Sequence, residues 1–265
     1  MELLPKKQEG AQSVRRALAV LRVLAAGQEH GVRLLDVAKA TGFNRATVHR
    51  LLQVMMEEGA VEQDPSSRKY LIGSEVSLMG MARTARFPIR SVAVPQMRTL
   101  SEKEGETSFL TIRSGDDSVC IARELGSFMV KVLSIEVGAR RPLGVGVSGL
   151  VLLAALDDEH VDDIIERNAS KLSNMGITAD ALRERVVQTR QKGYAFAPIG
   201  VVPYTRALAV PVYSPAAEVV AGLAVTAVSN RLPERRLPSL VNAMAMRAQA
   251  IGEAWARQEG SRRHE

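Results

Sequence analysis

The chain has 265 residues, enough for two domains, and its 46% hydrophobic and 4% aromatic residues suit a soluble globular protein with a substantial core. Its formal net charge of +6 is typical of a nucleic-acid binder, although a basic tail such as residues 261–264 can also produce it. The single cysteine, Cys120, excludes an intramolecular disulfide, and the four scattered histidines lack the spacing of zinc ligands. With neither a signal peptide nor a bilayer-spanning apolar run, we expect a cytoplasmic protein without cofactor or membrane partner.

The first predicted element is a helix that begins near Ser13, after a polar stretch at residues 1–12 that we expect to be flexible. Ser13 can cap this helix, because its hydroxyl can accept a hydrogen bond from a free N–H of the first turn. Apolar residues recur at helical spacing on one face, at Val14, Leu18, Leu21 and Leu24. Two glycines in residues 27–31 end the helix.

Residues 34–59 have the pattern of two helices joined by a tight turn. Gly42 ends the first, because glycine readily takes the left-handed conformation of a helix C-terminus, and Asn44 is a good N-cap for the second. The buried stripe of the second helix is Val48, Leu51, Leu52 and Met55. Polar side chains that point elsewhere are Arg45, Thr47, His49, Arg50 and Gln53. Three of these five can donate hydrogen bonds from long or flat polar groups, as base edges and phosphates require.

Two short strands follow, at residues 60–63 and 69–72, with turn residues between them. Arg68 and Lys69 would lie where such a wing meets the phosphate backbone of DNA. One alternative is an ordinary helical hairpin with a solvated basic face. The basic-tipped hairpin that follows without a gap favours instead a winged helix-turn-helix, which places one helix in the major groove.

The rest of the chain alternates between helical and strand-like patterns. Residues 74–86 predict a basic connector helix that ends before Pro88, because a helix is disfavoured at the residue preceding proline. Further helices are expected at residues 92–104, 147–156, 158–168, 179–192 and 238–258. Strands are expected at residues 107–112, 118–122, 129–135, 194–197, 207–213 and 219–228. Elements interleaved in this way around an antiparallel sheet predict an α+β domain.

Several of these segments resemble one known family. They are SVRRALAVLRVLA, LLDVAKATGFNRATVHRLLQVMMEEGAVEQD and KYLIG in the N-terminal half, and GARRPLGVGVSGLVLLAAL, RQKGYAF, ALAVPVYSP and VVAGLAVTAVSNRL in the C-terminal half. In this order they resemble the IclR family of bacterial transcriptional regulators, over residues 13–258. The resemblance implies a winged helix-turn-helix DNA-binding domain at residues 13–73, a linker helix at 74–87, a GAF-like α+β effector-binding domain at 88–259 and a tail at 260–265.

The same resemblance implies a homodimer or homotetramer that binds double-stranded operator DNA and a small organic effector. Two recognition helices of a dimer would enter successive major grooves, so the operator should be a pseudopalindrome. Base contacts are expected from Arg45, Thr47 and Arg50, and phosphate contacts from Ser13, Arg15, Arg68 and Lys69. The full set expected at the DNA also includes Asn44 and His49.

The C-terminal domain departs from the family pattern at several positions that usually carry polar groups. A lysine that usually follows a small residue and glycine is Leu150 here, and an acidic residue is replaced at Ala197. A cysteine that often precedes the ALAVPV strand is Ala207, and two hydroxyl positions of the last strand are Ala224 and Thr226. The site has therefore lost several polar ligands of the family's small-oxoacid binders.

These departures predict a more apolar pocket that takes a carboxylate with a sizeable apolar or aromatic body. The N–H groups of residues 146–149 open a helix and can hold the anionic end. The expected ligand residues are Phe109, Cys120, Ile121, Val145, Gly146, Val147, Ser148, Gly149, Ala197, Arg206, Ala207, Ala224 and Thr226. Alternatives remain: these residues can be packed core without a ligand, Arg206 a solvated strand-edge charge, and Cys120 a core residue rather than a redox sensor.

The sequence leaves two rivals to a ligand-controlled regulator to consider. An esterase-like enzyme would use Ser148 in a G-x-S-x-G turn, but the required second glycine is Leu150, and we expect no enzyme. Downstream Asp157, Asp158 and His160 lie on a helix surface where charges are normally solvated. The other rival is a DNA-binding protein whose C-terminal domain serves oligomerisation or protein partners, and the sequence leaves it open.

Overall fold

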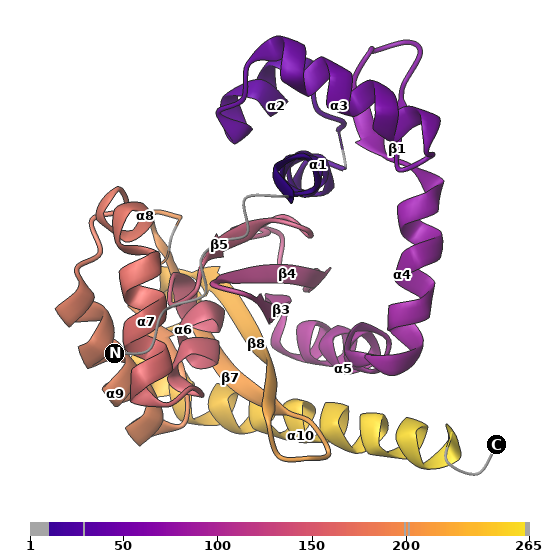
Figure 1. Ribbon diagram of the computed structural model, residues 1–265. Coiled ribbons are helices and arrows are strands. Elements are labelled where there is room, and N and C mark those ends of the chain that lie inside the picture. The colour runs from indigo at the N-terminus through magenta and orange to yellow at the C-terminus, as the bar shows by residue number, and fades with distance from the viewer. Residues whose placement is uncertain (1–10, 29, 199, 201, 263–265) are drawn as a thin grey trace. The chain divides into compact units, whose positions relative to one another are not determined.

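The computed structural model describes residues 11–28, 30–198, 200 and 202–262, and the chain forms two compact units, Met1–Phe87 and Pro88–Glu265 (Figure 1). Of the polar start expected to be flexible, residues 1–10 lie outside this description, and the first helix already begins at Gln12. No helix in the described ranges is long and apolar enough to cross a membrane.

The first unit is a winged helix-turn-helix. Its elements are α1 (Gln12–Ala26), α2 (Leu34–Thr41), α3 (Arg45–Glu57), β1 (Val61–Gln63), β2 (Tyr70–Ile72) and α4 (Ser74–Arg86). The two strands pair antiparallel, with Val61 opposite Ile72, and form the wing. Leu24 of α1, Val37 of α2 and Leu52 of α3 are fully buried in one small core, which fixes the three helices together.

The helix ends of this unit follow the local signals in the sequence, with one exception. Gly42 ends α2 at a φ of 71°, and the Asn44 side chain caps α3 by accepting from the Thr47 N–H at 2.8 Å. The expectation that Ser13 caps α1 is wrong. The helix begins one residue earlier, with Ala11 at the N-cap position and no side-chain cap, so Ser13 lies in its first turn.

The second unit is built on one six-stranded antiparallel sheet with the order β5-β4-β3-β8-β7-β6. The strands are β3 (Thr107–Ser114), β4 (Asp117–Glu124), β5 (Arg140–Pro142), β6 (Ala195–Ala197), β7 (Thr205–Tyr213) and β8 (Val219–Val228). Two short 3-10 helices, η2 (Ser229–Arg231) and η3 (Glu234–Arg236), follow the last strand. The winged unit and this sheet confirm the expected combination of a helix-turn-helix domain with an α+β domain.

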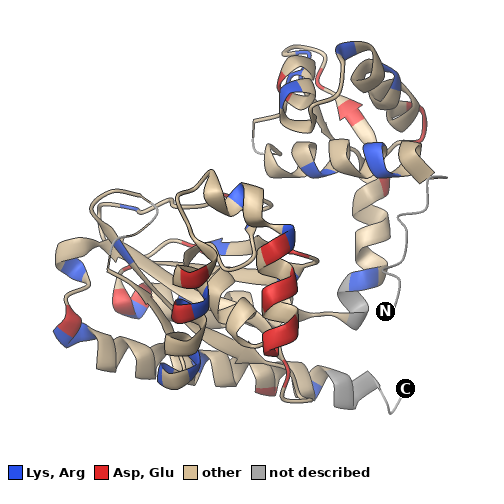
Figure 2. Cartoon of the chain, turned by 60° about the vertical axis from the view of Figure 1, so that its left-hand side comes forward, with Lys and Arg blue, Asp and Glu red and all other residues tan. Residues whose placement is uncertain are grey.

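Helices cover both faces of the sheet (Figure 1). One face carries α5 (Ile89–Glu104) and α10 (Leu237–Arg262), and Ser101 of α5 is hydrogen-bonded to Ser108 of β3 at 2.7 Å. The other face carries α6 (Gly146–Ala154), which α7 (Asp158–Arg167), α8 (Ala169–Ser173) and α9 (Ala179–Lys192) cover in turn. Positions of acidic residues are red on helices of this layer in Figure 2, and the sequence of α7 contains five of them.

Helix α6 is the central element of this layer, because Val147–Ala154 are all buried. It lies unusually close to the sheet at Gly222 of β8. A Cβ at Gly222 would lie 3.0 Å from the Ser148 carbonyl oxygen. The close approach therefore depends on the absence of a side chain there, and it fixes where the N-terminal half of α6 sits.

Three expectations for this unit differ from the structure. The strand expected at residues 129–135 is wrong: residues 125–139 form an irregular segment in which Met129 and Leu133 are exposed. The edge strand is instead β5, which pairs with residues 117–119 of β4. Helix α8 was not expected, and α10 continues to Arg262, so residues 260–262 are helical rather than a tail; residues 263–265 lie outside the described ranges.

Candidate DNA-binding surface and ligand cavity

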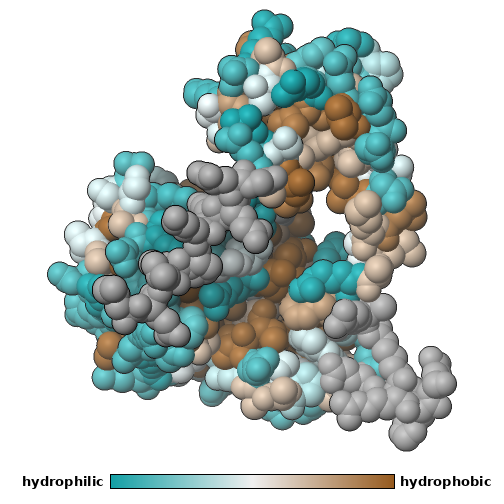
Figure 3. Space-filling view, viewed as in Figure 1, coloured by the Kyte–Doolittle hydropathy of each residue, from teal (hydrophilic) through white to brown (hydrophobic). Residues whose placement is uncertain are grey.

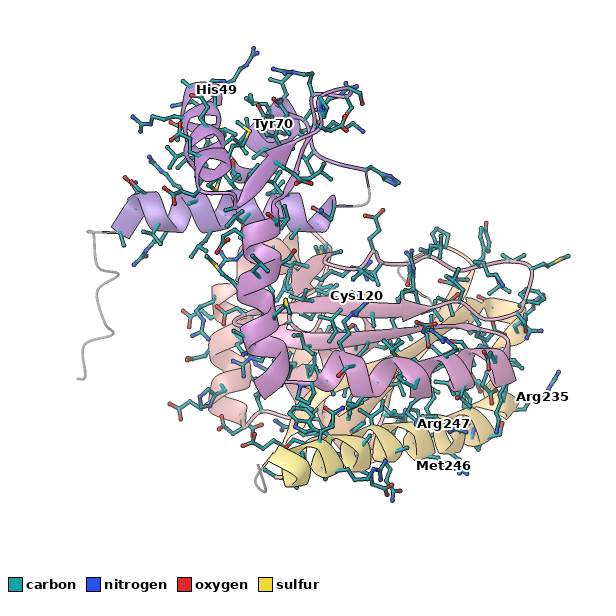
Figure 4. All side chains as sticks on the ribbon, turned by 90° about the vertical axis from the view of Figure 1, so that its right-hand side faces the viewer. His49, Tyr70, Cys120, Arg235, Met246 and Arg247 are labelled. Carbon is teal, nitrogen blue, oxygen red and sulfur yellow. The ribbon has the colours of Figure 1, made fainter. Side chains whose placement is uncertain are left out.

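Helix α3 presents a polar face away from the core of the first unit. Val48 is fully buried against α1 and α2, whereas Arg45, His49 and Arg50 are exposed and Thr47 is half-buried. Figure 4 shows His49 on the outer side of this helix. The alternation follows from the helical period, which puts Val48 and its exposed neighbours on different faces. Three exposed donors on one surface helix match the requirements of a recognition helix.

Asn44 and Thr47 are joined at the start of α3, and this limits what each can offer to a partner. The Asn44 Oδ1 atom accepts from the Thr47 backbone N–H at 2.8 Å, so it is occupied by the helix cap. Its Nδ2 group remains available as a donor. The structure thus gives Asn44 a role in positioning α3, whatever it contacts outside the chain.

The wing turn is organised around Asp64. Its Oδ1 atom accepts from the Ser66 hydroxyl and from the Ser67 N–H, both at 2.6 Å. These hydrogen bonds lower the pKa of Asp64 to about 2, because they stabilise its charged form. Arg68 then takes a left-handed backbone conformation, with φ at 57°, and its side chain is exposed.

Arg68 and Lys69 occupy different surroundings, although both were expected at DNA phosphates. The Lys69 Nζ atom donates to the His30 carbonyl oxygen at 2.8 Å and so ties the wing to the loop after α1. The Gln63 Nε2 atom donates to the Arg68 carbonyl oxygen at 2.9 Å, and this hydrogen bond orients the turn. Near the other end of the unit, Ser13 and Arg15 are exposed on the first turn of α1.

A cavity of about 360 Å³ lies in the second unit, between the sheet and the start of α6. It brings together most of the residues expected to bind an effector. These are Phe109, Val145, Gly146, Val147, Ser148, Gly149, Ala197, Ala207, Ala224 and Thr226. Phe109, Ala207 and Ala224 belong to the core beneath α6, so the floor of the cavity is apolar.

Cys120, Ile121 and Arg206 do not line this cavity, contrary to expectation. Cys120, labelled in Figure 4, is fully buried on β4, and burial raises the pKa of its thiol to about 11. Ile121 follows it in the strand and so points to the other side of the sheet. Arg206 likewise alternates with Ala207: its Nη1 atom donates to the Leu232 carbonyl oxygen at 3.0 Å.

Sequence reasoning missed the charged part of the cavity wall. Arg141 of β5 and Arg185 of α9 both line it, and both are half-buried. Burial lowers the pKa of each guanidinium from its ordinary value. The other residues missed are Thr111, Ser118, Ser134, Ile135, Met175, Ile177 and Gly200.

A single local signal could have indicated Arg141. Strand residues alternate between the two sides of a sheet, so Arg140 and Arg141 must point in opposite directions. Arg140 is hydrogen-bonded to the Ser114 hydroxyl at 2.8 Å, whereas the Arg141 Nη2 atom donates to the Ser134 carbonyl oxygen at 2.6 Å. For Arg185, on a helix 44 residues later in the chain, no comparable signal exists.

The described residues hold no cluster of three or more His, Cys, Asp or Glu that could bind a metal ion. His160 is bonded to Asp157, with 2.7 Å between Nδ1 and Oδ1, at the exposed start of α7. This pair caps a helix, and the Asp157 side chain also accepts from the His160 N–H at 2.9 Å. The downstream acid and histidine that a serine esterase would need are therefore used in local structure.

Comparison with known proteins assigns both units. The model of the IclR helix-turn-helix domain matches residues 13–65, and the model of the bacterial transcriptional regulator IclR C-terminal domain matches residues 81–253. The HTH-type transcriptional regulator XynR of Escherichia coli K12 is 27% identical over 92% of this chain and 96% of its own length.

Solved structures agree with the family models. A family regulator from Silicibacter sp. TM1040 has a TM-score of 0.76 and 26% identity, over 92% of this chain and 96% of its own. An IclR homologue from Microbacterium hydrocarbonoxydans, solved with 4-hydroxybenzoate, has a TM-score of 0.71 and 20% identity, over 92% and 99%, and shows the same fold. These relatives are transcriptional regulators and not enzymes, as expected. The chain belongs to the IclR family of bacterial DNA-binding transcriptional regulators.

Proposed function

We propose that the protein is an effector-controlled regulator that binds a pseudopalindromic operator as a dimer or tetramer and senses an organic acid with an apolar or aromatic body. The observation that carries this proposal is the cavity of about 360 Å³ with an apolar floor and cationic wall. Its size and its few polar groups are those of small-molecule sites.

On the DNA side, Arg45, Thr47 and Arg50 of α3 contact base edges in the major groove. The exposure of both arginines supports this role, since bidentate contacts to guanine are the commonest specific contacts that arginine makes. Phosphate contacts come from Ser13, Arg15, Arg68 and Lys69, and Asn44 and His49 complete the surface. Lys69 contributes less than Arg68, because its ammonium group already binds the His30 carbonyl.

Apolar side chains that remain exposed in the first unit support a dimer. Leu78, Met79 and Met81 are 58%, 63% and 68% exposed along α4, and Figure 3 shows hydrophobic surface over this helix. Val14 and Leu18 of α1 are exposed as well. Grouped exposed apolar residues of this kind mark protein interaction sites. A second copy covering them would bring two α3 helices to two half-sites.

On the effector side, the cavity favours a carboxylate over a neutral molecule, since Arg141 and the N–H groups at the start of α6 converge there. The apolar floor takes the body of the ligand. The relative solved with 4-hydroxybenzoate, an aromatic carboxylate, supports the same class. Regulation requires that the effector binds one arrangement of the protein better than another, and so shifts DNA affinity.

Two experiments test this proposal. Selection from random double-stranded DNA should recover inverted repeats, and recovery of single asymmetric sites would contradict a symmetric dimer. Thermal shift with a panel of carboxylic acids should show stabilisation by acids with an aromatic or long aliphatic body, followed by release of DNA from the complex. Stabilisation only by two- or three-carbon acids such as glyoxylate overturns the effector class, and none by any acid favours a domain without a ligand.

A further inference from the structure

The cavity of the second unit contains an unbalanced charge. Two guanidinium groups, those of Arg141 and Arg185, belong to its wall, and no aspartate or glutamate is among the described residues that line it. The other polar groups there are neutral hydroxyls. An arginine remains charged at any ordinary pH, so the wall carries two positive charges without a matching anion.

Several other arginines of this unit have acidic partners, whereas Arg206 and Arg247 bond to neutral oxygens, those of the Leu232 carbonyl and the Gln96 side chain. Arg140 pairs with Asp117 at 3.4 Å, and Arg236 with Glu106 at 3.1 Å. Further ion pairs join Arg167 to Asp116, Arg183 to Asp162, Arg190 to Asp158 and Arg231 to Glu106. For Arg141 and Arg185, no ion pair is found among residues 11–28, 30–198, 200 and 202–262.

The energetics of burial make an external anion the natural partner. Burial lowers the pKa of both guanidiniums, which means that their charged forms are destabilised in this environment. Arg141 has one neutral acceptor, the Ser134 carbonyl oxygen at 2.6 Å, and none is found for Arg185 in the described part of the chain. A ligand with one negative charge compensates only half of this excess, and a ligand with two compensates all of it.

We infer that the effector is a diacid, with one carboxylate held by Arg141 and a second held by Arg185, on either side of an apolar body. This rests on the proposed function and adds the second acidic group to it. The two arginines come from different elements, β5 and α9, so each can hold its own acidic group. Phe109, Ile135 and Ile177 line the same cavity and supply apolar contact for the body of the ligand.

The two carboxylates meet different surroundings. Arg141 lies beside the N-terminus of α6, since a Cβ placed on Gly146 would lie 3.7 Å from its Nη1 atom. The first carboxylate can therefore accept from Arg141 and from the free N–H groups of α6 together. The second has Arg185 as its one charged partner. Loss of Arg185 should therefore reduce the protein to a binder of monoacids.

The test uses the full-length protein and isothermal titration with two series of probes. Straight-chain dicarboxylates from succinate to suberate, and the three benzenedicarboxylates, cover a range of carboxylate separations. Each is compared with the monocarboxylate of the same length or with benzoate. We expect at least one diacid to bind 10-fold or more tightly than its matched monoacid.

Three variants test which arginine is responsible for the preference for a diacid over a monoacid. Arg185→Met should lower the affinity for the diacid about 10- to 100-fold while leaving the monoacid unchanged, since one charge-assisted hydrogen-bond pair is lost. Arg141→Met should weaken both. Arg183→Met is the matched control: this exposed arginine of the same helix is paired with Asp162 and Asp180, and its loss should change neither affinity. Circular dichroism confirms that each variant is folded.

If monoacids bind as tightly as diacids and Arg185→Met has no effect, the inference of a diacid is wrong, whereas the proposed effector class is retained. If phenyl phosphate binds as tightly as the diacids, and both Arg141→Met and Arg185→Met weaken its binding, the two arginines hold one doubly charged group and the inference of two separate carboxylates is wrong. Absence of binding by every acid tested overturns the inference and the proposed effector class together.

Discussion

At the scale of single residues, the two neighbouring arginines of β5 illustrate how position rather than residue type sets a role. Arg140 contacts Ser114 and Asp117 and stabilises the edge of the sheet. Arg141, one residue further, lies in the cavity wall because strand side chains alternate. A search for basic motifs would treat the pair as one patch. Because the strand is pleated, Arg140 has a structural role at the edge of the sheet, whereas Arg141 is a candidate ligand-binding residue.

The wing offers a residue-scale test of DNA binding. Arg68→Ala should weaken binding to all sequences alike and lower the slope of log affinity against log salt by about 0.9, the value of one phosphate contact. Because the Arg68 side chain is exposed, its truncation should not disturb folding, so weaker binding would reflect the lost contact with DNA. Fluorescence anisotropy at several salt concentrations measures the slope. A loss confined to one base position would contradict a phosphate contact and indicate base readout instead.

Asp64 gives the same wing a pH dependence. Because its pKa falls from 3.8 to about 2 in the folded chain, its ionised form stabilises the turn fully above pH 4, and this contribution is lost as pH falls through 2. The carboxyl resonance of Asp64 should therefore titrate near pH 2. The double change Ser66→Ala and Ser67→Ala should raise that midpoint toward 3.8. An unchanged midpoint would show that the hydroxyls of Ser66 and Ser67 are not the cause.

At the scale of elements, the sequence predicts structure well where several local signals agree. Helix α3 combines the cap at Asn44, an apolar stripe at helical spacing and a terminating glycine at 59, and it forms as expected. Residues 129–135 alternate as a strand would but lack a partner. The Cys120 N–H and carbonyl oxygen instead bond to Ala139 and Gly138, so that edge of β4 is occupied. Strand pairing is a long-range property that local alternation does not contain.

The contact between α6 and β8 provides an element-scale prediction. Gly222→Ala would place a Cβ 3.0 Å from the Ser148 carbonyl oxygen and 3.1 Å from its Cα atom, and backbone atoms cannot swing aside. We expect the free energy of unfolding of the second unit to fall by about 1–3 kcal/mol. Urea denaturation followed by the fluorescence of Trp255, the only tryptophan, reports on this unit.

A second measurement on the same variant concerns the cavity. The residues of α6 that meet Gly222 also form the cavity wall, so displacement of Ser148 should weaken effector binding together with stability. DNA binding by the first unit, which has its own core, should be retained in the absence of effector. Unchanged stability would mean that α6 can shift without loss of packing, and that the contact between α6 and β8 does not require glycine at position 222.

At the scale of the whole molecule, the residues hardest to predict were those that meet only through the fold. The apolar floor of the cavity could be predicted, because family resemblance located Ala207 and Ala224 on neighbouring strands. That Arg141 and Arg185 share one cavity could not be predicted, since a short edge strand and a helix become neighbours only when the sheet and its covering helices are assembled. The charged half of the site is thus a product of topology. A second acidic group on the effector is therefore inferred from the fold and not from the sequence.

Assembly is the whole-molecule property on which the proposed operator symmetry depends. The double variant Met79→Glu and Met81→Glu places charges on the most exposed apolar residues of α4. Both side chains face solvent in the single chain, so folding should be little affected, whereas an interface that buries them would lose their apolar contacts and acquire two buried charges. Sedimentation velocity should show a smaller species, and affinity for a two-half operator should fall while affinity for an isolated half-site stays the same.

The matched control is Met246→Glu on α10 of the second unit, where the methionine is equally exposed, at 68%. If the dimer is held by the first unit, this control should sediment like the wild type and bind a two-half operator normally. If the control instead dissociates the assembly and the α4 variant does not, the two recognition helices are joined through the effector-binding units. The spacing of half-sites would then depend on the connection at Phe87 and Pro88, and effector binding would act directly on the contact that holds the dimer together.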